Sequence, residues 1–185
     1  MKITQEPGIQ NSAFNFQRVG WVEMVSNSIP AHCEDIKVNL LAAFNQDNGL
    51  EAVDAYACAL TAAIATLNGE LAFEMEMDDV LRGKPEREAA KTAAGLAALM
   101  ATYIDASDSL DNSDNELVLG EWKKTTEVDE IKVGMYLYAA AVALRAKPLI
   151  MEYGQLLQAA GLSSSQLRSI IKIASVTAAI NKIAV

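Results

Sequence analysis

Two neighbouring residues, His32 and Cys33, form the pair in this sequence best suited to nucleophilic or redox chemistry. A thiolate is the reactive form of cysteine, and an adjacent imidazole or a helix N-terminus favours it. Pro30 is typical of a first helical turn, so the pair stands at a predicted helix start. Glu34 and Asp35 follow at once, and their negative charges disfavour a thiolate. His32 and Cys33 are therefore candidate catalytic residues, with an ordinary first-turn pair as the alternative interpretation.

The second cysteine, Cys58, lies in the apolar segment AYACALTAA. A free cysteine among small apolar residues behaves as a core hydrophobe, so we expect Cys58 to be buried. It remains a weaker candidate for thiol chemistry. Cys33 and Cys58 form no Cys-x-x-Cys pair, and two cysteines in 185 residues are not a disulfide scaffold. We expect no disulfide between them and a reducing, cytoplasmic compartment.

Two acidic segments raise the question of a metal site. FEMEMDD (73–79) places acids on a predicted helix, but carboxylate-bridged sites in paired helices also need Glu-x-x-His motifs. His32 is the one histidine of the chain. Residues 105–121 are also acidic, but the glycine and the final glutamate of a calcium-binding EF-hand loop are out of register there. We expect a solvated face and an acidic inter-repeat linker respectively, with no metal and no cofactor.

The overall composition excludes several classes of function. A formal net charge of −9 disfavours binding to nucleic acid or to an anionic membrane surface. The sequence has no uncharged apolar span of about 18 residues and no signal-peptide pattern. With 51% hydrophobic residues, 185 residues can bury a sizeable core. We therefore predict one domain over residues 1–185, with residues 1–12 as a flexible N-terminal arm.

The elements that position these residues are predicted to be helices throughout. Proline and glycine are scarce, and no run of β-branched residues with period two is long enough to require a strand. Apolar segments separated by Gly, Pro, Asn and Asp predict an all-α fold of eight helices. They span residues 13–26, 30–44, 50–67, 70–81, 86–104, 128–145, 148–160 and 163–183.

A shift of 78 residues superimposes two parts of the sequence without a gap. AAIATLNGELAFEMEMDDVLRG (62–83) lies over AAVALRAKPLIMEYGQLLQAAG (140–161). The matched helix breaks and glycines are better evidence for a repeat than the alanines, because helix-ending residues at the same spacing coincide by chance less often than alanines do. We predict two helical repeats, at about 62–104 and 140–182. Pro148 then falls at the joint that Gly69 and Glu70 occupy in the first repeat, where a proline opens a helix at no cost.

Several segments together resemble the alkylhydroperoxidase D (AhpD) group of the carboxymuconolactone decarboxylase-like superfamily. They are PAHCEDIKVNLLAAF (30–44), the alanine-rich helix at 89–100, and AAGLSSSQLRSIIKIASV (159–176). The resemblance implies an AhpD-like all-helical fold, an oligomer, often a trimer, and antioxidant thiol chemistry. In active members a Cys-x-x-Cys pair near the start of the second repeat's short helix reduces peroxides. Two histidines and a glutamate on the preceding helix relay protons.

The resemblance can be carried over position by position by counting back from Gly161. The two cysteine positions fall on Ala146 and Leu149, the histidine positions on Pro148 and Tyr153, and the glutamate position near Gly134. None of these residues matches the family, and no cysteine or histidine follows Cys58. The resemblance therefore predicts the fold while arguing against the family's usual reaction. We expect a degenerate active site.

Three hypotheses follow for function. The leading one is an AhpD-like, non-catalytic binding or structural module that forms a dimer, trimer or hexamer and binds a protein partner or a small apolar ligand. The competing one is an antioxidant peroxidase that acts through Cys33 or Cys58. The third is a non-thiol lyase or decarboxylase with a base near Tyr153, such as Glu152. The sequence favours a protein that is not an enzyme.

Overall fold

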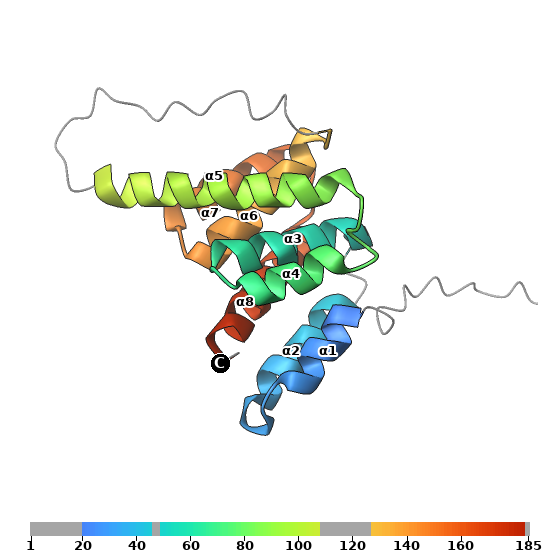
Figure 1. Cartoon of the computed structure of the whole chain (residues 1–185). Helices are drawn as coiled ribbons and strands as arrows, with labels where there is room; N and C mark the ends of the chain where they lie inside the picture. The colour runs from blue at the N-terminus through green and yellow to red at the C-terminus, as the bar shows by residue number, and fades with distance from the viewer. Residues whose placement is uncertain (1–19, 46–48, 108–126, 184–185) are drawn as a thin grey trace, which may run out of the picture.

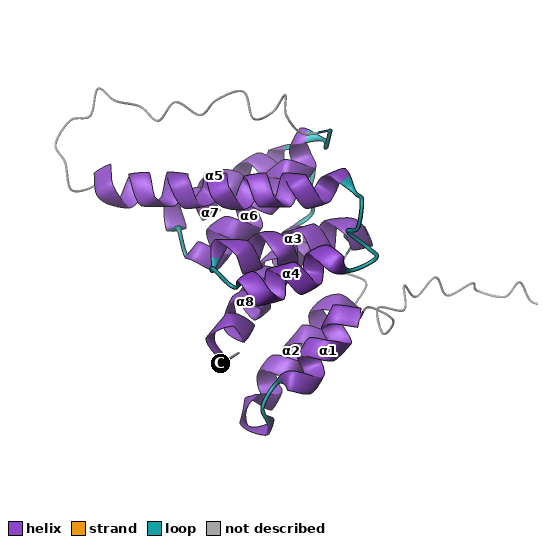
Figure 2. Cartoon of the chain, viewed as in Figure 1, coloured by secondary structure: helices purple, strands orange, loops and turns teal. Residues whose placement is uncertain are grey.

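The described part of the protein is helical throughout. The computed structural model describes residues 20–45, 49–107 and 127–183, and no strand occurs among them (Figure 2). They form eight α-helices and one short 3₁₀-helix, η2 (Ala31–Cys33). The predicted all-α fold is confirmed. The helices are α1 (Gly20–Ser28), α2 (Glu34–Asn45), α3 (Ala52–Ala65), α4 (Gly69–Met77), α5 (Pro85–Ser107), α6 (Glu130–Leu144), α7 (Lys147–Ala159) and α8 (Ser164–Ile183).

Two alanine-rich helices, α3 and α6, form the centre of the core. They pack against each other, and α5 and α8 each contact both of them (Figure 1). Every residue of α3 from Asp54 to Ala63 is buried, and most of α6 is buried as well. A helix that is apolar on all faces needs neighbours on all sides. This explains why the two most apolar segments of the sequence are central rather than peripheral.

Helices α1 and α2 lie together at one end of the molecule, as Figure 1 shows. Helix α2 packs against α8. A cluster of three aromatic side chains fastens both helices to α3, and its rings meet edge to face. The ring centroids of Trp21 and Phe44 are 5.1 Å apart, and those of Tyr56 lie 5.8 Å from Trp21 and 5.6 Å from Phe44. Such pairs add stability beyond the apolar area they bury.

The two predicted repeats are present as α3–α4–α5 and α6–α7–α8, and both begin earlier than the sequence match indicated. The joints after α3 and α6 have the same backbone conformation. Leu67 has φ 62° and Arg145 has φ 60°, both left-handed. At each joint the next residue donates its N–H to a carbonyl five residues back, Asn68 to Ala63 and Ala146 to Ala141, at 3.0 Å in both. This hydrogen bond belongs to the Schellman motif that ends many helices.

Pro148 lies in the first turn of α7, as predicted, because α7 begins at Lys147. Several other predicted boundaries differ from the structure by a few residues. Helix α4 ends at Met77 rather than at Leu81, since Asp78 takes an extended backbone and its carboxylate accepts the Val80 N–H at 3.0 Å.

Helix α5 continues to Ser107, three residues into the segment predicted as an acidic linker from 105 to 121. The end of that segment and the predicted N-terminal arm, 1–12, lie outside the described residues.

Candidate functional site

The joint between α6 and α7 carries the positions where the family resemblance places its cysteines and one histidine. Ala146 is the N-cap residue of α7 and offers no side-chain hydrogen bond. Its side chain is half-buried, Pro148 is exposed and Leu149 is buried. At the equivalent joint of the first repeat, Asn68 caps α4 by accepting the Leu71 N–H at 3.0 Å. The first turn of α7 therefore holds no cysteine and no histidine, and no side chain caps its N-terminus.

The two remaining positions given by the family resemblance are Gly134, where two helices approach closely, and Tyr153, which packs against α5. A Cβ atom added at Gly134 would lie 3.3 Å from Cδ2 of Leu157, so α6 and α7 approach closely there. Tyr153 is half-buried, and its hydroxyl group faces the Sδ atom of Met100 on α5 at 3.8 Å. Burial raises the pKa of Tyr153, and the neighbouring Glu152 carboxylate raises it further. Tyr153 is thus a protonated packing residue at neutral pH, and Glu152 is exposed.

The cysteines are both free and sit in different surroundings. Cys58 is fully buried, and its thiol donates weakly to the carbonyl oxygen of Met135 at 3.8 Å. Burial raises the pKa of the Cys58 thiol, and the nearby Asp54 carboxylate acts in the same direction. The prediction that Cys58 is a core residue is confirmed. Cys33 is half-buried at the end of η2, and the preceding His32 is exposed.

A buried polar cluster, which the sequence did not predict, lies between α3 and α6. The hydroxyl group of Tyr136 donates to Oδ1 of Asp54 at 2.7 Å. The ammonium group of Lys132 lies 3.2 Å from Oδ2 of Asp54, 2.9 Å from Glu51 and 3.8 Å from Glu86. Asp54 is only 4% exposed. The cluster therefore links the starts of α3, α5 and α6.

The pKa values of this cluster reflect burial first and pairing second. Burial raises the pKa of Asp54, and the hydrogen bonds from Tyr136 and Lys132 offset this only in part. Burial also raises the pKa of Tyr136, with the Asp54 carboxylate adding to the effect. For Lys132, burial alone would lower the pKa, but hydrogen bonds to Glu51 and Asp54 outweigh it. Tyr136 is protonated and Lys132 is charged at neutral pH.

One sequence signal could have revealed this cluster. The 78-residue shift pairs Asp54 with Lys132 and Cys58 with Tyr136. Asp54 and Lys132 are opposite charges at equivalent points of two otherwise apolar helices. Since isolated charges are rarely buried, such a match points to a partner across the repeat interface.

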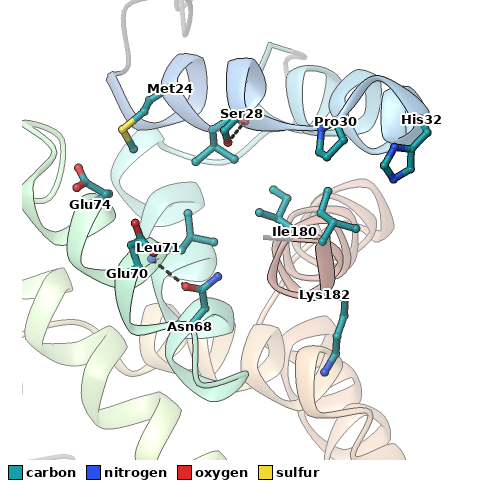
Figure 3. A pocket seen from close by; sticks show the side chains of 12 residues that line it. Met24, Ser28, Pro30, His32, Asn68, Glu70, Leu71, Glu74, Ile180 and Lys182 are labelled. Atoms are coloured by element: carbon teal, nitrogen blue, oxygen red, sulfur yellow. Dashed lines mark hydrogen bonds between the residues drawn. The ribbon is translucent and has the colours of Figure 1, made fainter. Parts of the chain in front are cut away.

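A cavity of about 790 Å³ opens between α1, η2, α4 and the end of α8 (Figure 3). His32 is the one predicted candidate residue among those lining it. The lining residues are Met24, Val25, Ser28, Pro30, His32, Asn68, Glu70, Leu71, Glu74, Ile180, Lys182 and Ile183. They come from three separate stretches of the chain, 24–32, 68–74 and 180–183, so local sequence patterns did not predict this cavity.

Comparison with known proteins shows a distant similarity to a characterised protein. The chain is 22% identical over 162 residues to the alkyl hydroperoxide reductase AhpD of Azorhizobium caulinodans, which covers 85% of this chain and 89% of that protein. No protein-family model matches the sequence. The similarity spans most of both chains and supports the AhpD-like resemblance. Within the described residues, every helix is too short or too polar to cross a lipid bilayer.

Proposed function

We propose that this protein is a member of the AhpD family that has lost the thiol peroxidase centre and serves as a binding module. Membership is supported by the distant similarity to an alkyl hydroperoxide reductase over most of the chain. It is also supported by the two helical repeats, with their matched left-handed joints at Leu67 and Arg145.

The observation that carries the proposal is where the thiols are. A thiol peroxidase needs an accessible cysteine whose thiolate is populated near neutral pH. Cys58 is fully buried, and its pKa is raised by that burial. The first turn of α7 holds Pro148 and Leu149, and its N-cap residue is Ala146. A peroxide that reached this joint would meet no thiol, and the half-buried Cys33 in η2 has no second cysteine two residues away to resolve it.

The non-enzymatic role is supported by the cavity beside α4. Ligand-binding cavities are concave, are mostly apolar and carry a few polar groups. The cavity between α1, η2, α4 and α8 has this character, and His32 at its rim is the one predicted site residue it includes. Binding in this cavity requires no thiol.

A homo-oligomer, in the form of a dimer, trimer or hexamer, is part of the proposal. Phe73 on α4 is 58% exposed and Met151 on α7 is 57% exposed. The two residues occupy equivalent positions of the repeats. We propose that these two exposed apolar side chains lie in the contacts between copies. Two free cysteines fit a reducing cytoplasm.

Peroxide consumption tests the proposal directly. The full chain is incubated with tert-butyl hydroperoxide and dithiothreitol, and the remaining peroxide is measured over time. The Azorhizobium relative at equal concentration is the positive control, and the Cys33→Ser and Cys58→Ser variants accompany the wild type. We expect the background rate from all three forms of this protein. Turnover comparable to the relative, abolished by Cys33→Ser or Cys58→Ser, would instead establish the antioxidant peroxidase.

A further inference from the structure

We propose that the cavity between α1, η2, α4 and α8 binds a small organic cation with an apolar body, such as an alkylammonium ion. The inference rests on the proposed function, because it names the ligand class of a binding module. Its basis is the arrangement of an apolar wall and two carboxylates around one open space (Figure 3).

The apolar part of the cavity comes from three helices. Val25 of α1, Leu71 of α4 and Ile180 of α8 line it, and these residues are 7%, 5% and 3% exposed. Met24 lines the same space and is 45% exposed, so a flexible thioether stands at the opening. A volume of about 790 Å³ suits a ligand of ordinary small-molecule size. The body of the ligand is therefore apolar.

The charged part of the cavity is a pair of carboxylates on α4. Glu70 and Glu74 are one helical turn apart, so they lie on the same face and repel each other. Both line the cavity. Among the ion pairs of the described residues neither takes part, whereas Glu76 on the next face of α4 is paired with Lys91 at 3.2 Å. A bound cation would relieve this repulsion and leave the Glu76 pair undisturbed.

The opposite end of the cavity limits the ligand to one positive charge near α4. His32 and Lys182 lie away from the two glutamates in Figure 3, toward η2 and the end of α8. Lys182 also lines the cavity, so a second cationic group at that end would lie near a like charge. The net charge of −9 favours the approach of cations in general. The local arrangement then selects a single positive charge followed by an apolar chain.

The wall that carries the glutamates is held in place by two hydrogen bonds. Asn68 accepts the Leu71 N–H at 3.0 Å and so fixes the start of α4. The side chain of Asn181 donates to the carbonyl oxygen of Thr66, which ties α8 to the joint before α4. These contacts fix the start of α4 relative to α8, two of the three helices that line the cavity, before any ligand binds. Such preorganisation lowers the entropic cost of binding.

Calorimetric titration of the full chain with hexyltrimethylammonium chloride tests the inference. Hexan-1-ol and sodium hexanesulfonate serve as neutral and anionic probes of similar length. We expect the cation to bind, the two other probes to bind at least about tenfold more weakly, and added salt to weaken the cation. Equal binding of hexan-1-ol, tighter binding of the sulfonate, or no heat from the cation would overturn the inference.

A double variant, Glu70→Gln with Glu74→Gln, locates the site. We expect it to weaken the cation by about tenfold or more. The matched control is Glu152→Gln, since Glu152 is the repeat equivalent of Glu74 on the exposed face of α7. It should leave the affinity unchanged. Thermal melts of both variants check that they are folded, and equal affinities for the double variant and the wild type would contradict the proposed site.

The two proposals fail in different ways. If the cation does not bind and peroxide is not consumed, the ligand class is wrong and the loss of the thiol centre still stands. If peroxide is consumed at the rate of an active relative, the proposed function is wrong whatever the titration shows.

Discussion

The two helical repeats share a backbone plan but differ in the side chains that matter most. The joints after α3 and α6 both carry a non-glycine residue in the left-handed region, Leu67 and Arg145. On the helices that precede these joints, Tyr56 of α3 corresponds to Gly134 of α6, and Cys58 corresponds to Tyr136. Backbone hydrogen bonds close the joints whatever side chains surround them. The repeats could therefore keep one geometry while their chemistry diverged.

The centre of the molecule shows what this divergence does. Asp54 and Lys132 occupy equivalent positions, and they contact each other across the repeat interface at 3.2 Å. A pair of identical residues there would place like charges together in a buried site. Each repeat supplies one half of the pair, so neither could be replaced by a copy of the other.

The largest contrast between the repeats concerns Tyr56 and Gly134. Tyr56 is fully buried against Trp21 and Phe44, and Tyr56→Ala removes the ring that fastens α1 and α2 to α3. By analogy with other buried aromatic residues, we expect a loss of about 3–5 kcal/mol in the free energy of unfolding. Urea denaturation measures it.

The matched change in the second repeat is Gly134→Ala. The added methyl group meets only the flexible side chain of Leu157, at 3.3 Å. Alanine stabilises a helix by about 1 kcal/mol relative to glycine. We therefore expect the free energy of unfolding to change by less than about 1 kcal/mol in either direction. Equal losses at the two positions would show that the aromatic cluster does not hold the N-terminal helices.

The contrast between Asp54 and Lys132 predicts a pH-dependent effect. In Lys132→Met the buried carboxylate loses its charged partner. At neutral pH we expect the free energy of unfolding to fall by somewhat less than the roughly 3–5 kcal/mol lost when a fully buried pair is broken. The reason is that the Lys132 side chain is 27% exposed. The pKa of Asp54 is already raised in the folded protein. Without Lys132 it should rise further.

The sign of the pH effect follows from that direction. A carboxyl group with a raised pKa in the folded state binds its proton more tightly there than in the unfolded chain. Its stabilising contribution is complete below the unfolded pKa of about 4 and is lost as the pH rises through the folded pKa. The difference in free energy of unfolding between the wild type and Lys132→Met should therefore shrink as the pH is lowered from 7 toward about 4.

Lys91→Met is the control for this experiment, since Lys91 forms ion pairs with Glu76 and Glu88 near the surface. We expect it to cost about 0–1 kcal/mol with little dependence on pH in this range. Urea titrations of both variants and the wild type at several pH values provide the comparison. A deficit for Lys132→Met that stays constant with pH would contradict the assignment of Asp54 as the titrating group.

The smallest expected effect on stability comes from the left-handed residue that both repeats carry at their joint. A non-glycine residue in the left-handed region costs about 1–2 kcal/mol, and part of the gain from glycine is lost to its freer unfolded chain. Leu67 is 91% exposed and Arg145 is exposed, so neither substitution sacrifices buried contacts. We expect Leu67→Gly and Arg145→Gly each to raise the stability by about 0.5–1 kcal/mol.

Thermal denaturation measures these two variants against Gly161→Ala. Gly161 has φ 99°, a conformation that alanine adopts only with strain, so this control should lower the stability. Stabilisation at one joint and not at the other would break the equivalence of the two joints.

The local features of this protein were predictable from its sequence. Residue types and their immediate neighbours were enough to predict three of them. These are the helix start at Pro148, the helix stop at Gly161 and the burial of Cys58. The end of α4 was predicted four residues too late, since the choice of Asp78 between helix and a side-chain turn was not evident in an apolar pattern.

Contacts between distant segments were less predictable. The Tyr136 hydrogen bond to Asp54 and the ion pair with Lys132 join residues about eighty positions apart. Their charges were visible in the sequence, but the crossing of α3 and α6 that brings them together was not. The cavity depends on α1, η2, α4 and α8 meeting at one place, and no single segment carries a signal for it.

The sequence by itself determined the helices, the repeat and the residue types at the α6–α7 joint, where the family resemblance places its reactive positions on Ala146, Pro148, Leu149 and Tyr153. These follow from periodicity, punctuation and residue identity, which act over a few residues. Only the tertiary structure decided that Asp54 meets Lys132 and that Glu70 and Glu74 face an apolar wall. Burial and charge pairing depend on how helices cross, and that geometry is a property of the whole packed chain.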